Sequence, residues 1–270
     1  MPNLKRNLFQ LKKNLLRKAR VYVNYNDDAL MREWFFKHAP RLTKFKDLHR
    51  GESCFIIGNG PSLNKMDLSR LKGYHTFGLN KIYLIFKQVD LELSYHVAVN
   101  RLVIEQSLED FRALRCPSFL SYRAARPFVG KEESRFHYLA GGGPFTFSKD
   151  IRAPLHEGYT VTFVAMQIAY YMGFEKVYLI GVDHNFQAKG EATEEQFLAE
   201  DDQNHFDPGY FKNHHWQLPD LEASELAYHL ARYFYRRDGR QVFDATFEGR
   251  LNIFPKITFE EALAGAQKRT

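Results

Sequence analysis

The residues of this 270-residue chain best suited to chemistry stand directly after short apolar segments. The first group is Gly58-Asn59-Gly60-Pro61-Ser62, which follows the apolar run 53–57. Glycines let a backbone approach a ligand closely and adopt positive φ. Amides exposed at a helix start favour phosphate. We therefore predict that phosphate binds the amides of residues 58–62. A purely structural turn is the alternative, because this is neither a Walker loop nor a full dinucleotide fingerprint.

Asparagines follow the next two apolar segments along the chain. Asn80 comes after residues 75–79, and Asn100 after residues 95–99. The carboxyl ends of parallel strands form the ligand crevice of such sheets. An amide side chain there can both donate to and accept from a base or a sugar. One such asparagine is explained as a helix cap, but three, counting Asn59, favour a nucleotide site.

A second glycine turn occurs at Gly181-Val182-Asp183-His184-Asn185. Asp183 could orient a ribose hydroxyl or hold Mg²⁺ bridged to phosphates, and a turn-stabilising aspartate is the alternative. Further side chains able to bind a metal are His184, His205, Asp207, His214 and His215. They show no His-x-x-x-His spacing, so metal binding is the weaker hypothesis and the metal is unknown.

Short apolar segments at 53–57, 75–79, 95–99, 118–121, 177–181 and 241–244 alternate with helical stretches. This pattern predicts a Rossmann-like α/β fold with a mostly parallel sheet flanked by helices. Residues 160–172 are apolar nearly all round and predict a buried helix, which Gly173 terminates. Asp220 is expected to cap an amphipathic helix over 221–237. The polar segment 185–219 is strand-poor and predicts a functional loop.

The amino-terminal 20 residues hold seven Lys and Arg and no acidic residue, with leucines at helical spacing. They predict a basic amphipathic helix, docked on its own domain, on a second copy in a homo-oligomer, or on an anionic membrane surface. A second helix is expected over 27–38. We divide the chain into this extension, residues 1–48, and a nucleotide-binding catalytic domain, residues 49–270. The seven basic residues within 1–20 can account for the whole net charge of +6, which argues against nucleic acid as a partner.

Two cysteines, Cys54 and Cys116, give neither a disulfide framework nor a metal pattern. No apolar stretch is long enough to span a bilayer, and the amino terminus lacks the features of a signal peptide. We therefore expect a cytoplasmic protein, with peripheral attachment to the inner face of the membrane as the alternative that the basic helix offers.

These motifs together resemble two related families. Residues 58–63, Asn80, Asn100 and the run 165–183 are similar to bacterial sialyltransferases that use CMP-sialic acid. A more specific resemblance is to the domain named after archaeal 6-hydroxymethylpterin diphosphokinase. It is carried by residues 181–185, His205-Phe206, Tyr210-Phe211 and residues 244–249. The resemblance covers roughly residues 50–260.

The resemblance implies roles for single residues. Asn59, Asn80 and Asn100 match nucleotide contacts, and His215, five residues before Asp220, matches the general base. An imidazole suits this role because its pKa lies near neutrality, and neighbouring His214 is the alternative. The predicted nucleotide site comprises Gly58, Asn59, Gly60, Ser62, Asn80, Asn100, Thr160, Gly181 and Asp183, with His184 and His205 as an additional site.

The chain also departs from the sialyltransferase pattern. That family carries Arg and Thr-Ser-Gly before the buried helix, whereas residues 156–162 contain no Arg, and Glu157 would repel a sialic carboxylate. These departures argue against CMP-sialic acid as the donor. The Gly141-Gly142-Gly143-Pro144 loop is either a lid or a long turn.

The leading functional hypothesis is a glycosyltransferase of surface glycan synthesis that uses a nucleotide donor, perhaps CMP-linked, and an acceptor glycan. The first alternative is a Mg²⁺-dependent diphosphokinase that transfers pyrophosphate from ATP to a pterin-type alcohol. The second alternative is a non-catalytic nucleotide-binding module.

Overall fold

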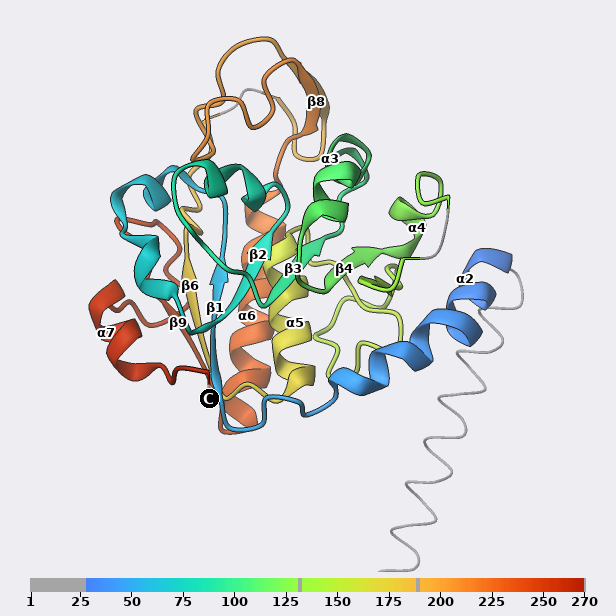
Figure 1. Ribbon diagram of the computed structural model, residues 1–270, viewed down its shortest axis with the longest axis horizontal. Coiled ribbons are helices and arrows are strands. Elements are labelled where there is room, and N and C mark those ends of the chain that lie inside the picture. The colour runs from blue at the N-terminus through green and yellow to red at the C-terminus, as the bar shows by residue number, and fades with distance from the viewer. Residues whose placement is uncertain (1–27, 131–132, 188–189, 270) are drawn as a thin grey trace, which may run out of the picture.

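The structure is a computed structural model that describes residues 28–130, 133–187 and 190–269 (Figure 1). The basic helix predicted for residues 1–20, with its membrane and oligomer alternatives, lies outside this part of the chain. Among the described residues, no helix has the length and apolar character needed to cross a bilayer.

A parallel sheet of seven strands forms the centre of the molecule, in the order β5-β4-β3-β2-β1-β6-β9. The Rossmann-like α/β prediction is confirmed, and so are all six predicted strands, within one residue at each end. The strand Phe136–Leu139 was not predicted. The strands are β1 Ser53–Ile57, β2 His75–Leu79, β3 Tyr95–Ala98, β4 Ser118–Ser121, β5 Phe136–Leu139, β6 Lys176–Ile180 and β9 Gln241–Asp244.

The order of the strands reverses at β1. From β1 the chain winds outward through β2, β3, β4 and β5, and it then returns to add β6 and β9 on the other side of β1. At such a switch point the loops after neighbouring strands lead away in opposite directions and open a crevice at the carboxyl edge. The turns after β1 and β6 flank that crevice.

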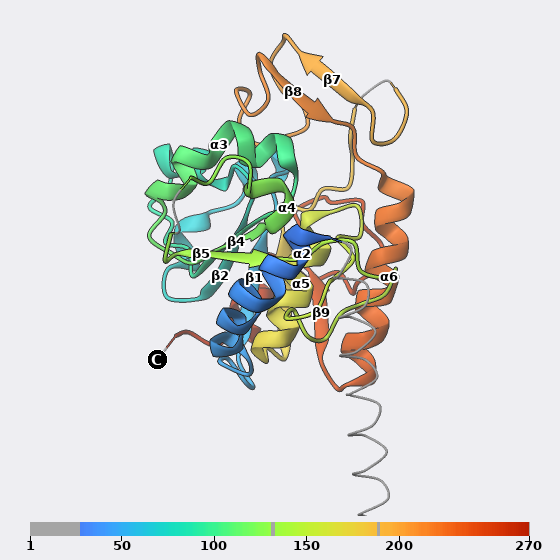
Figure 2. The same cartoon turned by 90° about the vertical axis from the view of Figure 1, so that its right-hand side faces the viewer.

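Two long helices cover one face of the sheet (Figure 2). Helix α5, Val161–Met172, is buried along almost its whole length, is capped by Thr160 and ends at Gly173 with φ 98°. Helix α6, Leu221–Arg237, is capped by Asp220. Both predictions are confirmed. The remaining helices are α3 Arg101–Ala113, α4 Tyr122–Ala125 and α7 Phe259–Gly265, with 3-10 turns η3 Pro61–Lys65, η4 Leu68–Leu71 and η5 Ile82–Lys87.

Residues 29–45 form a helical segment that packs on the outer strand β5. It runs as α2 Ala29–Glu33, a π-helical turn η1 Trp34–His38 and a 3-10 helix η2 Ala39–Phe45. The fully buried indole of Trp34 donates from Nε1 to the carbonyl of Tyr138 in β5 at 2.7 Å. The helix predicted over 27–38 is therefore present from residue 29. The domain boundary at residue 48 stays a prediction, and residues 29–45 share the core of the α/β body.

A small antiparallel hairpin stands beyond the carboxyl ends of the parallel strands (Figures 1 and 2). It pairs β7, Glu195–Leu198, with β8, His214–Gln217. The prediction of a strand-poor segment over 185–219 is wrong at these two places. Most side chains of both strands face solvent, so their sequences lack the apolar character that marks the strands of the central sheet.

Candidate functional site

A cavity of about 590 Å³ lies at the carboxyl edge of the sheet, at the switch point. The ends of β1, β2, β3 and β6 and the first turns of α5 and α6 line it. Most predicted site residues meet there: Gly58, Asn59, Gly60, Asn80, Asn100, Thr160, Gly181, Asp183, His184 and His205. Ser62 and His215 are not among the lining residues.

The glycine turn after β1 is fastened to the turn after β6. Gly58 donates its amide to the last residue of β6 at 2.8 Å, and Gly60 donates to the carbonyl of Gly181 at 2.9 Å. Ser62 donates twice to Asp183, from its amide to Oδ1 at 3.0 Å and from its hydroxyl to Oδ2 at 2.7 Å. These three amides donate to protein acceptors, so they are not available to a phosphate in this structure, and phosphate binding at the turn stays a prediction.

Glycine is required in this turn for packing within the protein. A Cβ at Gly58 would lie 2.2 Å from the carbonyl oxygen of Gly181, and one at Gly60 would lie 1.8 Å from Oδ2 of Asp183. Both distances are far below van der Waals contact. The turn was interpreted as making room for a ligand, but it makes room for the neighbouring strand end.

Asp183 therefore holds the turn after β6 to the turn after β1. Burial raises the pKa of its carboxyl above the usual range, while the hydrogen bonds from Ser62 act in the opposite direction. Since both of its oxygens already accept hydrogen bonds from Ser62, Asp183 is poorly suited to hold the Mg²⁺ that the sequence suggested.

Asn59 and Asn80 each present a buried acceptor that lacks a partner. The Oδ1 atoms of both side chains accept no hydrogen bond within the described chain. Asn80 also adopts φ 48°, a conformation uncommon for residues other than glycine. A buried polar atom left without a partner costs about 1–3 kcal/mol. Both residues line the cavity, so a ligand that donates from an amino group or a hydroxyl would satisfy these oxygens if it reached them.

Asn100 is already fully engaged. Its Oδ1 caps α3 by accepting from the amides of Leu102 and Val103, at 2.9 and 3.3 Å, and its Nδ2 donates to Oε1 of Gln217 at 3.1 Å. Asn100 thus acts as the helix cap that the sequence offered as an alternative, and it also holds the end of β8.

The first turn of α5 lines the same cavity. Thr160 caps it by accepting from the amide of Thr162 at 3.3 Å, and its hydroxyl lies 3.3 Å from that of Tyr228. A twelve-residue helix carries partial positive charge at its start, where the first amides have no partner within the helix. This helix start is a better place for a phosphate than the glycine turn.

His205 is held in place by a buried carboxylate and an aromatic ring. Its Nδ1 lies 2.8 Å from Oδ2 of Asp202, a buried carboxylate, and its ring stacks on Tyr210 at 3.9 Å between centroids. A carboxylate on Nδ1 fixes the tautomer and leaves Nε2 for a substrate. His184 instead uses Nε2 to contact Glu225 at 2.8 Å.

His215 lies elsewhere, on β8 of the hairpin. Its side chain is 58% exposed, with Nδ1 at 3.3 Å from Oε1 of Glu195. The structure does not bring it to the cavity. Its role as general base stays a prediction, for which the hairpin would have to move.

The segment between β6 and α6 is anchored through residues of the cavity edge. Phe206 donates its amide to the carbonyl of Asn59 at 2.9 Å. The amide of Lys81 donates to the hydroxyl of Tyr210 at 3.2 Å, and Nζ of Lys81 donates to the carbonyl of Tyr210 at 2.8 Å. Burial lowers the pKa of Lys81 to about 8. The hairpin is thereby connected to the loops that follow β1 and β2.

A second, larger cavity of about 1,850 Å³ adjoins the first. The two share a wall that includes Asn100, His156, Glu157 and the glycine loop at Gly142. Burial raises the pKa of the Glu157 carboxyl, and a Cβ at Gly141 would lie 2.7 Å from its Oε1. From the sequence, Glu157 was interpreted only as a repulsive charge. The glycine loop was the available signal, because Gly141 leaves space for this half-buried acid.

Comparison with protein families gives a match to the 6-hydroxymethylpterin diphosphokinase MptE-like model over residues 33–189, more than half of the chain. The chain belongs to this family. The match spans the strands β1 to β6 and includes Asn59, Asn80 and Asp183. It confirms the more specific of the two resemblances. No curated protein matches the chain.

Two solved structures are similar in fold. The MAf glycosyltransferase from Magnetospirillum magneticum AMB-1 superposes with a TM-score of 0.51 at 13% identity, covering 89% of this chain and 42% of that one. This chain therefore spans about two fifths of the length of that protein. The second is the sialyltransferase CstII from Campylobacter jejuni in complex with a substrate analogue, cytidine-5'-monophosphate. Its TM-score is 0.46 at 18% identity, covering 77% of this chain and 86% of that one.

Proposed function

We propose that this protein is a glycosyltransferase that moves a sugar from a nucleotide donor to a glycan acceptor in surface glycan synthesis. The observation that carries the proposal is the pair of cavities with a common wall. One has the size of a nucleotide site and the other is larger, and Asn100, His156 and Glu157 line both. Two substrates bound side by side would bring their reacting ends to that wall.

In this proposal the nucleotide occupies the smaller cavity. Its base or ribose donates to the buried Oδ1 atoms of Asn59 and Asn80. Its phosphate lies at the first turn of α5, beside Thr160, where the helix dipole stabilises negative charge. The resemblance of residues 58–63 to the sialyltransferases favours a cytidine nucleotide.

The chemistry follows from this placement. An acceptor hydroxyl attacks the anomeric carbon of the donor, and the bond from that carbon to the phosphate oxygen breaks. The departing phosphate keeps the electron pair and is stabilised at the start of α5. The hydroxyl proton passes to Nε2 of His205, which lines the smaller cavity and not the common wall, so the acceptor hydroxyl has to reach from that wall into the smaller cavity. Asp202 stabilises the imidazolium through Nδ1. His215 is the competing candidate for the base.

The diphosphokinase remains the second candidate because the description of the family refers to that activity. Such a reaction needs carboxylates arranged around Mg²⁺. Asp183 accepts from Ser62 with both oxygens, and Asp202 accepts from the amide of Asn204 and contacts His205. The larger cavity also exceeds the roughly 300–1,000 Å³ of ordinary small-molecule pockets, which suits a glycan better than a small alcohol. Both observations favour the glycosyltransferase.

Thermal-shift measurements with CMP, CDP, UDP, GDP, ADP and ATP, each with and without Mg²⁺, test the proposal. We expect stabilisation by a cytidine nucleotide without Mg²⁺, followed by release of CMP from a CMP-sugar when an acceptor glycan is added. Stabilisation by ATP only with Mg²⁺ would favour the diphosphokinase. Binding without turnover of any donor would favour the non-catalytic module.

Variants of the two asparagines link this result to the cavity. Asn59→Ala and Asn80→Gly remove the buried acceptors, and glycine retains the positive φ at position 80. Asn252→Ala is the matched control, because Asn252 is exposed and lies outside both cavities. Equal nucleotide affinity in all three variants would remove the asparagines from the site.

A further inference from the structure

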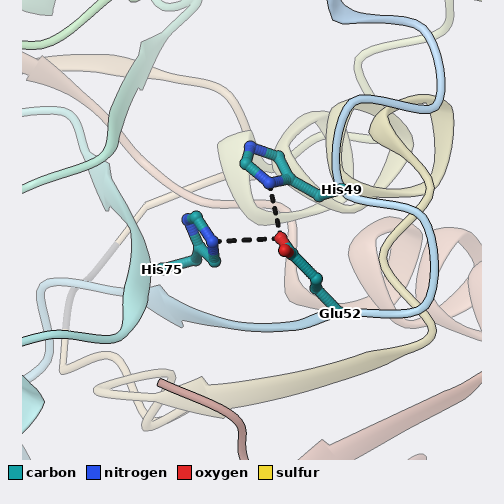
Figure 3. A group of neighbouring side chains, drawn as sticks. All are labelled: His49, Glu52 and His75. Carbon is teal, nitrogen blue, oxygen red and sulfur yellow. Dashed lines mark hydrogen bonds and ion pairs between the residues drawn. The ribbon is translucent and has the colours of Figure 1, made fainter. Parts of the chain in front are cut away.

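Two histidines and a glutamate converge at the amino edge of the sheet, the edge opposite the nucleotide cavity (Figure 3). His49 and Glu52 lie just before β1, and His75 is the first residue of β2. Parallel pairing places His75 beside Cys54 of β1. The proposed transferase chemistry uses none of these three side chains.

The three side chains meet on one carboxylate oxygen. Oε2 of Glu52 lies 2.6 Å from Nδ1 of His49 and 3.0 Å from Nε2 of His75 (Figure 3). One ligand atom from each residue lies within 4.8 Å of the other two. The histidine side chains are each 12% exposed and that of Glu52 is 36% exposed. The cluster is therefore sheltered, and an ion can still reach it past Glu52.

The surrounding structure holds these groups in place. The His49 ring stacks on Phe174 at 4.6 Å, and its Nε2 lies 2.6 Å from the hydroxyl of Tyr95. The amide of His49 donates to the carbonyl of Met172 at 2.7 Å. Outer contacts of this kind orient a metal-binding imidazole and fix its tautomer.

His75 contacts the cluster through one ring nitrogen, Nε2, which lies 3.0 Å from Oε2 of Glu52. Arg269, whose charge acts on His75, is paired with Glu92 at 2.8 Å. Nδ1 of His75 is buried without a hydrogen-bond partner in the described chain, so the role of His75 in the fold does not depend on both of its nitrogens.

We propose that His49, Glu52 and His75 form a zinc site with Nδ1, a carboxylate oxygen and Nε2 as its ligands. Two imidazoles and one carboxylate suit Zn²⁺, and water would complete the four-coordinate set. Ligand atoms at zinc lie about 3.3 Å apart for bonds of about 2.0–2.1 Å. The present separations of 2.6 and 3.0 Å must therefore widen slightly, and Glu52, the most exposed member, can move.

The site has a defined structural effect. It would connect the turn before β1 to the start of β2, and so stabilise the pairing of these two strands. The missing partner of His75 Nδ1 limits the affinity, because losing an outer hydrogen bond costs about 10–100-fold in metal binding. We therefore expect a dissociation constant in the micromolar range.

Calorimetry with Zn²⁺ alone, on protein without an affinity tag, tests the proposal. We expect one zinc per chain, no heat from Mg²⁺, and a rise in Tm of about 5–10 °C at 100 times the dissociation constant. His75→Gln and Glu52→Gln should each weaken zinc binding at least tenfold. His229→Gln, at an exposed histidine of α6, is the matched control and should bind zinc as the wild type does.

Folding of each variant is checked by its circular dichroism and by its Tm without metal. Equal zinc affinity in wild type and His75→Gln would overturn the proposal. If His75→Gln does not fold, the visible absorption spectrum of the wild type with Co²⁺ tests the proposal. We expect the intense absorption of four-coordinate Co²⁺, which a six-coordinate surface complex lacks. A weak, six-coordinate spectrum would also overturn it. Neither outcome bears on the nucleotide cavity, which lies at the other edge of the sheet.

Discussion

Replacing Gly60 by alanine should break the hydrogen bonds that join the turn after β1 to the turn after β6. The new Cβ would lie 1.8 Å from Oδ2 and 2.3 Å from Cγ of Asp183. The carboxylate must then leave its place and lose both hydrogen bonds from Ser62. At about 1.5 kcal/mol for each bond to a charged group, Gly60→Ala should lower the free energy of unfolding by about 3 kcal/mol.

Urea unfolding followed by circular dichroism measures this loss, and Tm should fall by about 6–12 °C. Gly130→Ala is the matched control, because nothing lies within 4 Å of a Cβ at Gly130. That variant should change the free energy of unfolding by less than about 1 kcal/mol.

A double variant tests the stated cause. Asp183→Ala removes the same two hydrogen bonds and also removes the group that a Cβ at Gly60 would strike. Gly60→Ala combined with Asp183→Ala should therefore cost about as much as Asp183→Ala alone, with a coupling energy of about 3 kcal/mol. Additive losses, or an unchanged stability in Gly60→Ala, would refute the reasoning.

Three further outcomes can be measured. Asn59→Ala and Asn80→Gly should each weaken nucleotide binding about fivefold in calorimetry, the equivalent of one hydrogen bond of about 1 kcal/mol, and unchanged affinity counts against the site. His205→Gln should lower turnover by about 10²–10⁴-fold while nucleotide affinity is retained, and His215→Gln should not. If His215→Gln lowers turnover and His205→Gln does not, the general base is His215. Burial raises the pKa of Glu157 above 4.5, so the folded state binds its proton more tightly and stability falls as pH rises from 4.5 through the raised value. Glu157→Gln should match the wild type in urea unfolding near pH 4 and exceed it near pH 8, and parallel pH profiles would exclude this role.

The sequence predicted the sheet well because its strands are buried on both faces. Residues 53–57 and 177–181 are continuous apolar runs, and burial on both faces leaves no polar alternation to confuse the assignment. Helix α6 was recognised from its cap and its amphipathic pattern. The hairpin strands were missed because seven of their eight residues are partly or fully exposed.

The sequence indicated which residues meet at the cavity, but not most of the contacts that they make. The sequence grouped Asn59, Asn80 and Asp183 correctly at one edge, because strand ends of a parallel sheet meet there. It could not reveal that Asp183 is committed to Ser62, since that contact joins residues 121 positions apart. The contact of Asp202 with His205 spans only three residues, but nothing in the polar segment 185–219 marks which of its carboxylates is buried.

The anchoring of the hairpin segment has a kinetic consequence. The backbone of Asn59 holds Phe206, and Lys81, next to Asn80, holds Tyr210. The loops that carry Asn59 and Asn80, the two asparagines proposed to contact the nucleotide, thus also anchor the segment above the cavity. A ligand that draws Asn59 and Asn80 inward must pull on that segment, and hydrogen exchange at the amides of Phe206 and Lys81 should slow when nucleotide binds. If that exchange slows, nucleotide binding and the tightening of the segment above the cavity are one step in the time course.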